Sequence, residues 1–222
     1  MYYKELANFS LFQNVSKESV DLINAMNIRV KNFKVGERVN FLGDPIQYIY
    51  VIASGCLKTN EYLMNGKEIV SSYYFGYDAF PLYLIYGGAT TYPYNIYCHK
   101  QAQVYCLPVE ELKACIDADP KLMSNVLVFV SKYCLKNKKV IQTVSYPKVS
   151  QRLAFWLLTS SDQRDNFRIP GTQELFSDIL LVNRSSLNQE LKRLTNNGII
   201  SIYGRRIHIN DRSALNRILE NT

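Results

Sequence analysis

The sequence lacks any apolar run long enough to cross a membrane, and its start, MYYKELANFS, lacks the basic residues and the apolar centre of a signal peptide. It contains only two histidines, and its five cysteines form no CxxC pair. These absences argue against a membrane protein, a disulfide framework, a zinc site and a metal cluster. We therefore expect a cytoplasmic protein whose cysteines act as small apolar side chains.

The chain has 222 residues, of which 47% are hydrophobic and 20% are charged, and this is enough for two modest domains with separate cores. Its formal net charge is +7. Residues 1–145 hold 15 Lys and Arg against 12 Asp and Glu, whereas residues 146–222 hold 11 against 7. Positive charge is therefore denser in the C-terminal third, as a phosphate-bearing partner would require.

Residues 172–198, TQELFSDILLVNRSSLNQELKRLTNNG, predict two helices joined by a short turn at Leu181-Val182, with Asn183 as the N-cap of the second. In the second helix, three leucines share one face and hydrogen-bonding side chains share the other: Ser185, Asn188, Gln189 and Lys192. Such a polar face suits a recognition helix in a DNA major groove. A helical hairpin with one solvated face is the alternative.

A predicted β-hairpin follows the second helix and favours DNA binding over that alternative. Asn197-Gly198 ends the helix, residues 199–203 and 206–210 alternate as two strands, and Gly204-Arg205 forms the turn between them. Two helices followed by a basic hairpin make a winged helix. Arg205 and Arg206 are then placed to meet phosphates beside the groove.

The first half of the chain predicts a β-domain preceded by short helices. Residues 1–26 form one or two helices, the second capped by Ser16. Short alternating segments follow, and seven or eight such strands indicate a barrel or a jelly roll. The predicted strands are 28–35, 38–42, 46–52, 56–63, 67–75, 92–98 and 102–107.

Asp119-Pro120 starts a long helix that runs to about Ser145, and Tyr146-Pro147 then forms a hinge before a helix over residues 148–159. A 4-3 apolar stripe on the long helix predicts pairing with a second copy of the chain. The residues of this stripe are Leu122, Val126, Phe129, Tyr133, Val140 and Val144. The prediction is an α+β chain with a double-stranded β-helix (jelly-roll) domain over 1–118, a dimerisation helix and hinge over 119–146, and a winged helix-turn-helix domain over 147–222.

The order of these parts, together with Val182-Asn183-Arg184-Ser185-Ser186-Leu187 and Gly198-Ile199-Ile200, resembles the Crp/Fnr family of bacterial transcription regulators and its V-S-R-E-T-L and G-L-I signature. Further matches are Phe33-Lys34-Val35-Gly36-Glu37 and Asn65-Gly66-Lys67-Glu68. The resemblance implies a homodimeric regulator that binds a pseudo-palindromic DNA operator, and that contacts RNA polymerase if it is an activator. The predicted DNA-binding residues are Thr172, Asn183, Arg184, Ser185, Ser186, Asn188, Gln189, Lys192, Arg205 and Arg206. Of these, the resemblance implies base contacts for Arg184, Ser185 and Gln189, and phosphate contacts for Thr172 and Ser186.

The sequence also departs from the family. Residues 76–94 contain no Arg to hold a cyclic phosphate, so we expect no binding of cyclic AMP. No Cys precedes Cys56, which argues against an iron-sulfur oxygen sensor, and a structural role is favoured for Cys98 and His99 over haem ligation. Ser185 stands where the family commonly has Glu. Leu181 stands where it has Gly, which is tolerable only if the turn keeps a negative φ.

Aromatic side chains remain in the β-domain where the family binds its effector. We expect some of them to line a pocket for an apolar or aromatic small molecule other than cyclic AMP. The predicted pocket residues are Tyr74, Phe80, Leu82, Tyr83, Tyr92, Tyr94, Phe129 and Tyr133. Two alternatives are a regulator that needs no effector, its β-domain being a structural or protein-docking platform, and a metal-dependent enzyme. The β-domain offers one His and no His/Glu cluster, so we expect neither catalytic residues nor a cofactor.

Overall fold

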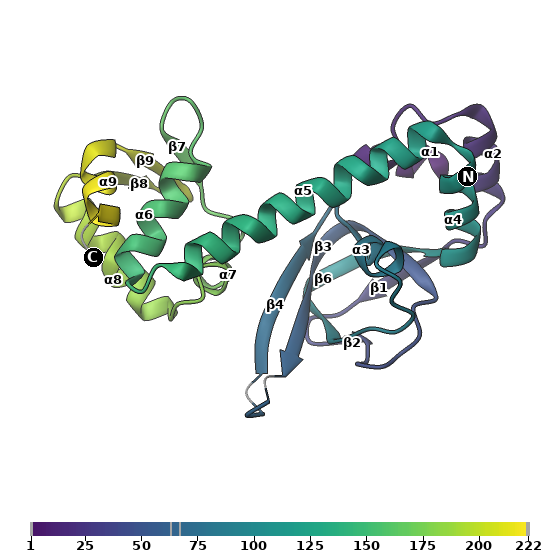
Figure 1. Cartoon of the computed structure of the whole chain (residues 1–222), viewed down its shortest axis with the longest axis horizontal. Helices are drawn as coiled ribbons and strands as arrows, with labels where there is room; N and C mark the ends of the chain where they lie inside the picture. Colours follow the sequence, from purple (N-terminus) through teal and green to yellow (C-terminus); the bar gives the residue numbers. More distant parts are fainter. Residues whose placement is uncertain (1, 63, 67, 221–222) are drawn as a thin grey trace. The chain divides into compact units, whose positions relative to one another are not determined.

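The computed structural model describes residues 2–62, 64–66 and 68–220. The chain divides into two compact units, Met1–Lys132 and Tyr133–Thr222, and helix α5 (Pro120–Ser145) passes from the first into the second (Figure 1). Each unit has its own hydrophobic core. Among the described residues, no helix is both long and apolar enough to span a membrane.

Short helices open the first unit, as the sequence predicted. They are α1 (Tyr3–Leu6), a 3-10 turn η1 (Ser10–Phe12) and α2 (Lys17–Ala25). Ser16 caps α2, because its hydroxyl accepts a hydrogen bond from the Ser19 amide at 3.1 Å. Leu6, Phe12 and Ile23 are fully buried and attach these helices to the core of the unit.

An antiparallel sheet forms the body of the first unit. Its strands are β1 (Arg29–Phe33), β2 (Arg38–Asn40), β3 (Tyr48–Tyr62), β4 (Glu68–Phe75), β5 (Ala79–Phe80) and β6 (Asn95–Pro108). The main order is β1-β6-β3-β4, with β2 paired to β6 and β5 paired to β3. The expected combination of an N-terminal β-domain, a long helix and a C-terminal helical domain is therefore confirmed.

Two breaks predicted within the sheet are wrong. The predicted strands 46–52 and 56–63 are the single strand β3, and the predicted strands 92–98 and 102–107 belong to the single strand β6. Gly55 lies at a β-bulge with a φ of 89°, and a Cβ there would lie 2.1 Å from the Gln101 carbonyl oxygen. Glycine therefore marks a close approach of two strands here and not a turn. Residues 63 and 67, at the ends of two predicted strands, lie outside the described residues.

Asp119 joins three helices at the base of the first unit. It is the N-cap of α5, and a proline follows it at the first helical position. It also ends α4 (Val109–Ala118), because its amide donates to the Cys115 carbonyl. One carboxylate oxygen accepts from the Lys121 and Leu122 amides at 2.8 and 3.2 Å. The other accepts from the Ser16 amide and the Ser19 hydroxyl at 2.8 and 2.7 Å. Burial alone would raise the pKa of this carboxyl, but the four donors outweigh it and hold the pKa well below its usual range.

We expect Asp119→Ala to destabilise the first unit by about 2–3 kcal/mol at pH 7, because it removes a helix cap and leaves the Ser16 and Ser19 donors without their acceptor. A carboxyl whose pKa is lowered by folding stabilises fully above its unfolded pKa of about 3.9, and that contribution fades as the pH falls below it. The free-energy difference between variant and wild type should therefore shrink below about pH 4. Urea unfolding followed by circular dichroism at pH 7 and in acid measures both values. An equal difference at both pH values would contradict the role of the charge.

The second unit is a small helical domain with a three-stranded sheet. Its elements after α5 are α6 (Val149–Ser160), β7 (Asn166–Arg168), α7 (Gln173–Ile179), α8 (Arg184–Asn196), β8 (Ile200–Tyr203), β9 (Arg206–Ile209) and α9 (Arg212–Glu220). The sheet order is β7-β9-β8, so β7 adds a strand to the predicted hairpin. Phe176, Leu187 and Leu194 are fully buried at the centre of the core. The sequence predicted α6, α7, α8 and the hairpin but neither β7 nor α9.

The sequence predicted that an apolar stripe on α5 pairs two copies of the chain. For the N-terminal residues of this stripe the prediction is wrong. Leu122 and Val126 are buried in the core of the first unit, and Phe129 packs against it. Val140 packs against the core of the second unit. A different set of apolar side chains remains exposed on α5: Leu127, Val128, Leu135 and Ile141. The stripe read from the sequence is therefore mainly the face that α5 turns toward its own chain.

Candidate nucleic-acid interface

Helices α7 and α8 form the helix-turn-helix that the sequence predicted. Thr172 caps α7, and its hydroxyl oxygen accepts from the Leu175 amide at 3.2 Å. This bond leaves the hydroxyl hydrogen of Thr172 able to donate to a phosphate. Leu175 and Phe176 anchor α7, and three leucines on one face, Leu187, Leu191 and Leu194, anchor α8. The same burial turns the opposite face of α8 to solvent.

The turn between the two helices contains a leucine in the left-handed region. The Leu181 amide donates to the Asp178 carbonyl and the Val182 amide to the Ser177 carbonyl, both at 3.0 Å. This pair of bonds is a Schellman motif, which requires a positive φ at its central residue. Leu181 has a φ of 49°, so the turn does not keep the negative φ under which a leucine would be tolerated without strain. The same motif at the end of α8 uses a glycine, Gly198, with a φ of 69°.

Leu181→Gly should stabilise the second unit by roughly 0.5–1 kcal/mol, because glycine avoids the steric cost of about 1–2 kcal/mol for an L-residue in this region while losing more backbone entropy on folding. The leucine side chain is 52% exposed, so little apolar burial is lost. Urea unfolding can be followed by fluorescence of Trp156, the only tryptophan in the sequence, which lies in this unit. Leu181→Ala is the control, since it shortens the side chain but keeps Cβ. Equal stability of the two variants would contradict the backbone explanation.

The exposed face of α8 carries positive and hydrogen-bonding groups. Its residues are Arg184, Ser185, Gln189, Lys192 and Asn196, of which Asn196 was not predicted. On the flank of this face, Arg193 forms a two-nitrogen ion pair with Glu190, whose hydrogen bond raises the pKa of the arginine. Among the described residues, no ion pair involves Arg184 or Lys192. The acidic group of α8 is thus neutralised within the helix, and two cations remain for phosphates or guanine.

Three other predicted contact residues occupy the edges of this face. Asn183 is exposed at the N-cap, and its side chain makes no capping hydrogen bond. Ser186 and Asn188 are half-buried, and the amide oxygen of Asn188 is buried without a hydrogen-bond partner in the described part of the chain. Their contacts with DNA remain predictions.

The β8–β9 hairpin places its basic residues at an exposed tip. Gly204 and Arg205 form the turn, and both Arg205 and Arg206 are exposed. The Arg205 guanidinium donates to the Ile169 carbonyl at 3.2 Å, and the Arg205 carbonyl accepts from the Ile169 amide at 2.9 Å. These bonds tie the tip to the segment that follows β7. The hairpin is therefore braced, and both of its arginines remain exposed.

Arg168 is a third exposed cation on this sheet, and the sequence reasoning missed it. It lies directly opposite Arg206 in the β7–β9 register, and no ion pair involves either residue in the ranges that the structure describes. Like charges directly opposite on neighbouring strands are destabilising unless an anion lies between them. The charged Arg168 lies between the apolar residues Phe167 and Ile169, which are both buried, and this alternation in the sequence could have predicted a strand. Arg168 and Arg206 therefore place two exposed positive charges side by side on neighbouring strands.

Arg168→Ala should weaken DNA binding for all sequences alike and lower the slope of log affinity against log salt by about 1, because one phosphate contact and its released counterion are lost. Titration of a labelled duplex at several salt concentrations measures this slope. Arg164→Ala, which removes an exposed arginine ahead of β7, should leave the slope unchanged. Equal slopes for wild type and Arg168→Ala would place Arg168 away from the DNA.

In the first unit, most of the predicted effector residues form core. Tyr74, Phe80, Leu82, Tyr92 and Tyr94 are each no more than 3% exposed. The rings of Tyr74 and Phe80 stack with centroids 4.6 Å apart, and burial strongly raises the pKa of the Tyr92 hydroxyl. The Tyr94 hydroxyl is 2.7 Å from that of half-buried Tyr83. Phe129 packs against the core of the first unit, whereas Tyr133 belongs to the second unit, so the assignment of one common pocket stays a prediction.

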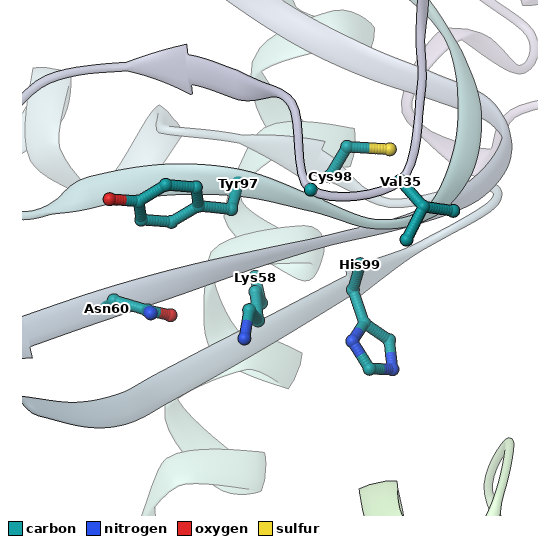
Figure 2. A pocket seen from close by; sticks show the side chains of 7 residues that line it. Val35, Lys58, Asn60, Tyr97, Cys98 and His99 are labelled. Carbon is teal, nitrogen blue, oxygen red and sulfur yellow. The ribbon is translucent and has the colours of Figure 1, made fainter.

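A separate open pocket of about 380 Å³ lies on this sheet, and its lining residues are Val35, Gly36, Lys58, Asn60, Tyr97, Cys98 and His99 (Figure 2). Lys58 and His99 are its basic groups. The sulfur of Cys98 points away from the imidazole of His99 (Figure 2), and its single S–H lies within hydrogen-bonding distance of the Phe33 and Lys100 carbonyls, at 3.4 and 3.2 Å. Adjacent residues of a strand face opposite sides of the sheet, so Cys98 and His99 do not form a joint ligand pair.

Both units match known domain families. Residues 151–218 match the model of the Crp-like helix-turn-helix domain, and residues 30–119 match the model of the cyclic nucleotide-binding domain. The global nitrogen regulator of Synechococcus elongatus is 23% identical over 201 residues, which are 86% of this chain and 89% of the relative. The transcriptional activator protein anr of Pseudomonas aeruginosa is 22% identical over 213 residues, with shares of 93% and 86%. The structure of FixK2 from Bradyrhizobium japonicum has a TM-score of 0.64 at 15% identity, covers 86% of this chain and 96% of its own, and shows the shared fold.

Proposed function

We propose, from the premise that this chain belongs to the Crp/Fnr family of transcription regulators, that it recognises a specific DNA operator with the exposed face of α8 and holds the flanking phosphates with the β7–β9 sheet. The observation that carries this proposal is the exposed face of α8. It presents Arg184 and Lys192 without intramolecular ion pairs in the described residues, beside the short polar side chains of Ser185 and Gln189. Arginine can pair with guanine through two hydrogen bonds, and Gln with adenine.

Pairing of two copies through α5 is part of the proposal, and the exposed apolar side chains of this helix support it. Four apolar side chains are exposed on this helix: Leu127, Val128, Leu135 and Ile141. Val128 and Leu135 are 7 residues apart, and Leu127 and Ile141 are 14 residues apart. Apolar residues that recur with the heptad period are suited to helix pairing between two copies. A two-fold dimer presents two copies of α8 to successive major grooves, with half-sites about 10 bp apart. In an activator, the same assembly would also contact RNA polymerase.

Control by cyclic AMP is not part of the proposal. Residues 76–94 contain no Arg to neutralise a cyclic phosphate, and the side chains of Tyr74, Phe80, Tyr92 and Tyr94 are buried, with the ring of Tyr74 stacked on that of Phe80. We propose that any effector is an apolar or aromatic molecule that replaces some of these contacts. The tight packing also favours the second candidate, a regulator that needs no effector. High operator affinity of the purified protein without added ligand would distinguish the second candidate from the first.

Selection of bound duplexes from a random DNA library tests the proposed function. We expect the full chain to select a pseudo-palindrome and to bind it at least about 1000-fold more tightly than random DNA at physiological salt. The selected duplex should carry two protein copies, which analytical ultracentrifugation can count. Binding without sequence preference, or with one copy on each duplex, would contradict the proposal.

A further inference from the structure

The Arg152 side chain in the first turns of α6 holds together three segments of the second unit. Its Nε donates to the Tyr146 carbonyl at 2.7 Å, and one terminal nitrogen donates to the Val144 carbonyl at 3.3 Å. The other terminal nitrogen donates to the Leu180 and Leu181 carbonyls at 3.2 and 2.9 Å. One guanidinium thus joins the last turn of α5, the segment that follows it and the turn between α7 and α8.

The four acceptors are backbone carbonyls at or just beyond the ends of α5 and α7. Val144 lies in the last turn of α5, and Leu180 is the C-cap of α7, so their carbonyls have no helical N–H ahead of them. Both helix ends also carry partial negative charge, which a guanidinium complements. The rigid fork of an arginine can serve carbonyls in several directions at once, which a lysine cannot.

Arg152 also stabilises the strained turn before α8. It bonds to the carbonyl of Leu181, whose φ of 49° is the costly feature of the turn before α8. In the described ranges, no carboxylate forms an ion pair with Arg152. The role of its hydrogen bonds is therefore to hold the turn in position, and not to neutralise an acidic side chain.

We propose that Arg152 is a positioning residue that sets the orientation of α8 against the C-terminal end of α5, and thereby the half-site spacing that the dimer accepts. This inference rests on the proposed function, because it assumes dimerisation through α5 and DNA reading by α8. Arg152 touches neither DNA nor the dimer partner in this proposal. Without its guanidinium, the end of α5 and the turn before α8 lose their direct link, and α8 samples a wider range of orientations.

The test compares wild type with Arg152→Gln, Arg152→Lys and the control Arg212→Gln, all as full chains. Arg212 is matched to Arg152, because it also holds a helix end: it donates to the Leu158 carbonyl at 3.1 Å and pairs with Asp165. Within the described residues, none of its hydrogen bonds or ion pairs reaches α5 or the turn before α8. Each protein is titrated with the operator selected by the wild type, with operators whose half-sites lie one base pair closer or farther apart, and with a duplex that carries one half-site. Thermal unfolding by Trp156 fluorescence confirms that each variant is folded.

We expect the preference of wild type for the selected spacing to fall roughly tenfold in Arg152→Gln and in Arg152→Lys, while affinity for the single half-site stays within about twofold. Arg212→Gln should keep the spacing preference of wild type even where it lowers the unfolding temperature. If Arg152→Gln or Arg152→Lys keeps the full preference, or if Arg212→Gln loses it equally, the positioning role is overturned. A wild-type chain that selects no operator would instead contradict the proposed function.

Discussion

Leu135→Asp is expected to convert the dimer into a monomer and to lower operator affinity by about 100-fold or more. Leu135 is 67% exposed on α5, and it lies seven residues beyond Val128, which is also exposed. In a paired helix these side chains form the seam, where two aspartates, one from each copy, would be buried close together. A monomer binds each half-site separately and loses the effective-concentration gain of about 10²–10⁴ that linked sites provide. Sedimentation velocity and operator titration measure the two effects.

The matched control is Leu22→Asp on α2, because Leu22 is also an exposed leucine in a helix, at 50% exposure. It introduces the same charge away from α5 and should leave both dimer and operator affinity unchanged. Since Leu135 is exposed within its own chain, Leu135→Asp should keep the unfolding temperature of an isolated monomer. A dimer that persists in Leu135→Asp would show that the chains pair through another surface.

Arg184→Ala is expected to weaken specific binding of the selected operator by about 1–3 kcal/mol and to relax the choice at one base pair of each half-site. Arg184 is the first residue of α8 and is exposed. In a major-groove complex, the N-terminal residues of such a helix reach the base edges. The stability of the Arg184→Ala variant should hardly change, because the Arg184 side chain makes no ion pair within the described residues. Competition titration against single-base variants of the operator identifies the position that is read.

Arg217→Ala is the control for Arg184→Ala, since it removes an exposed arginine of the same unit from α9 and breaks only its ion pair with Asp211, at 3.6 Å. It should retain the operator preference. The distinction between base reading and phosphate contact lies in the pattern of losses. If Arg184→Ala weakens binding to all duplexes by the same factor, Arg184 contacts a phosphate and the base-reading assignment is wrong.

Local sequence patterns were sufficient for the elements whose signals lie within a few residues. Ser16 and Thr172 are N-caps as a hydroxyl ahead of a helix predicts, and the three leucines of α8 fall on one buried face. The hairpin around Gly204 also forms as predicted. The Arg residues of this hairpin and of α8 were found for the same reason, because charge and periodicity are properties of short segments.

Other features could be decided only by the tertiary structure, because they depend on contacts between residues that are far apart in the chain. Gly55 reads as a turn in sequence, yet the approach of Gln101 makes it a bulge within a continuous strand. The stripe on α5 reads as a dimer seam, yet the core of the first unit buries Leu122 and Val126, Val140 packs against the core of the second unit, and a different set of apolar side chains is exposed. Packing partners decide such cases, and a periodic pattern does not say which partner it will meet.

The helix-turn-helix of residues 172–198 shows the same division at the level of the site. The sequence by itself determined that a helix with a polar, basic face would follow a short turn, because leucine spacing and capping residues act locally. It did not predict that Leu181 adopts a positive φ, that Arg168 faces Arg206, or that Arg152 joins the turn to the end of α5. Each of these features depends on a backbone carbonyl or a charged group brought close by folding, and such proximity is a property of the tertiary structure alone.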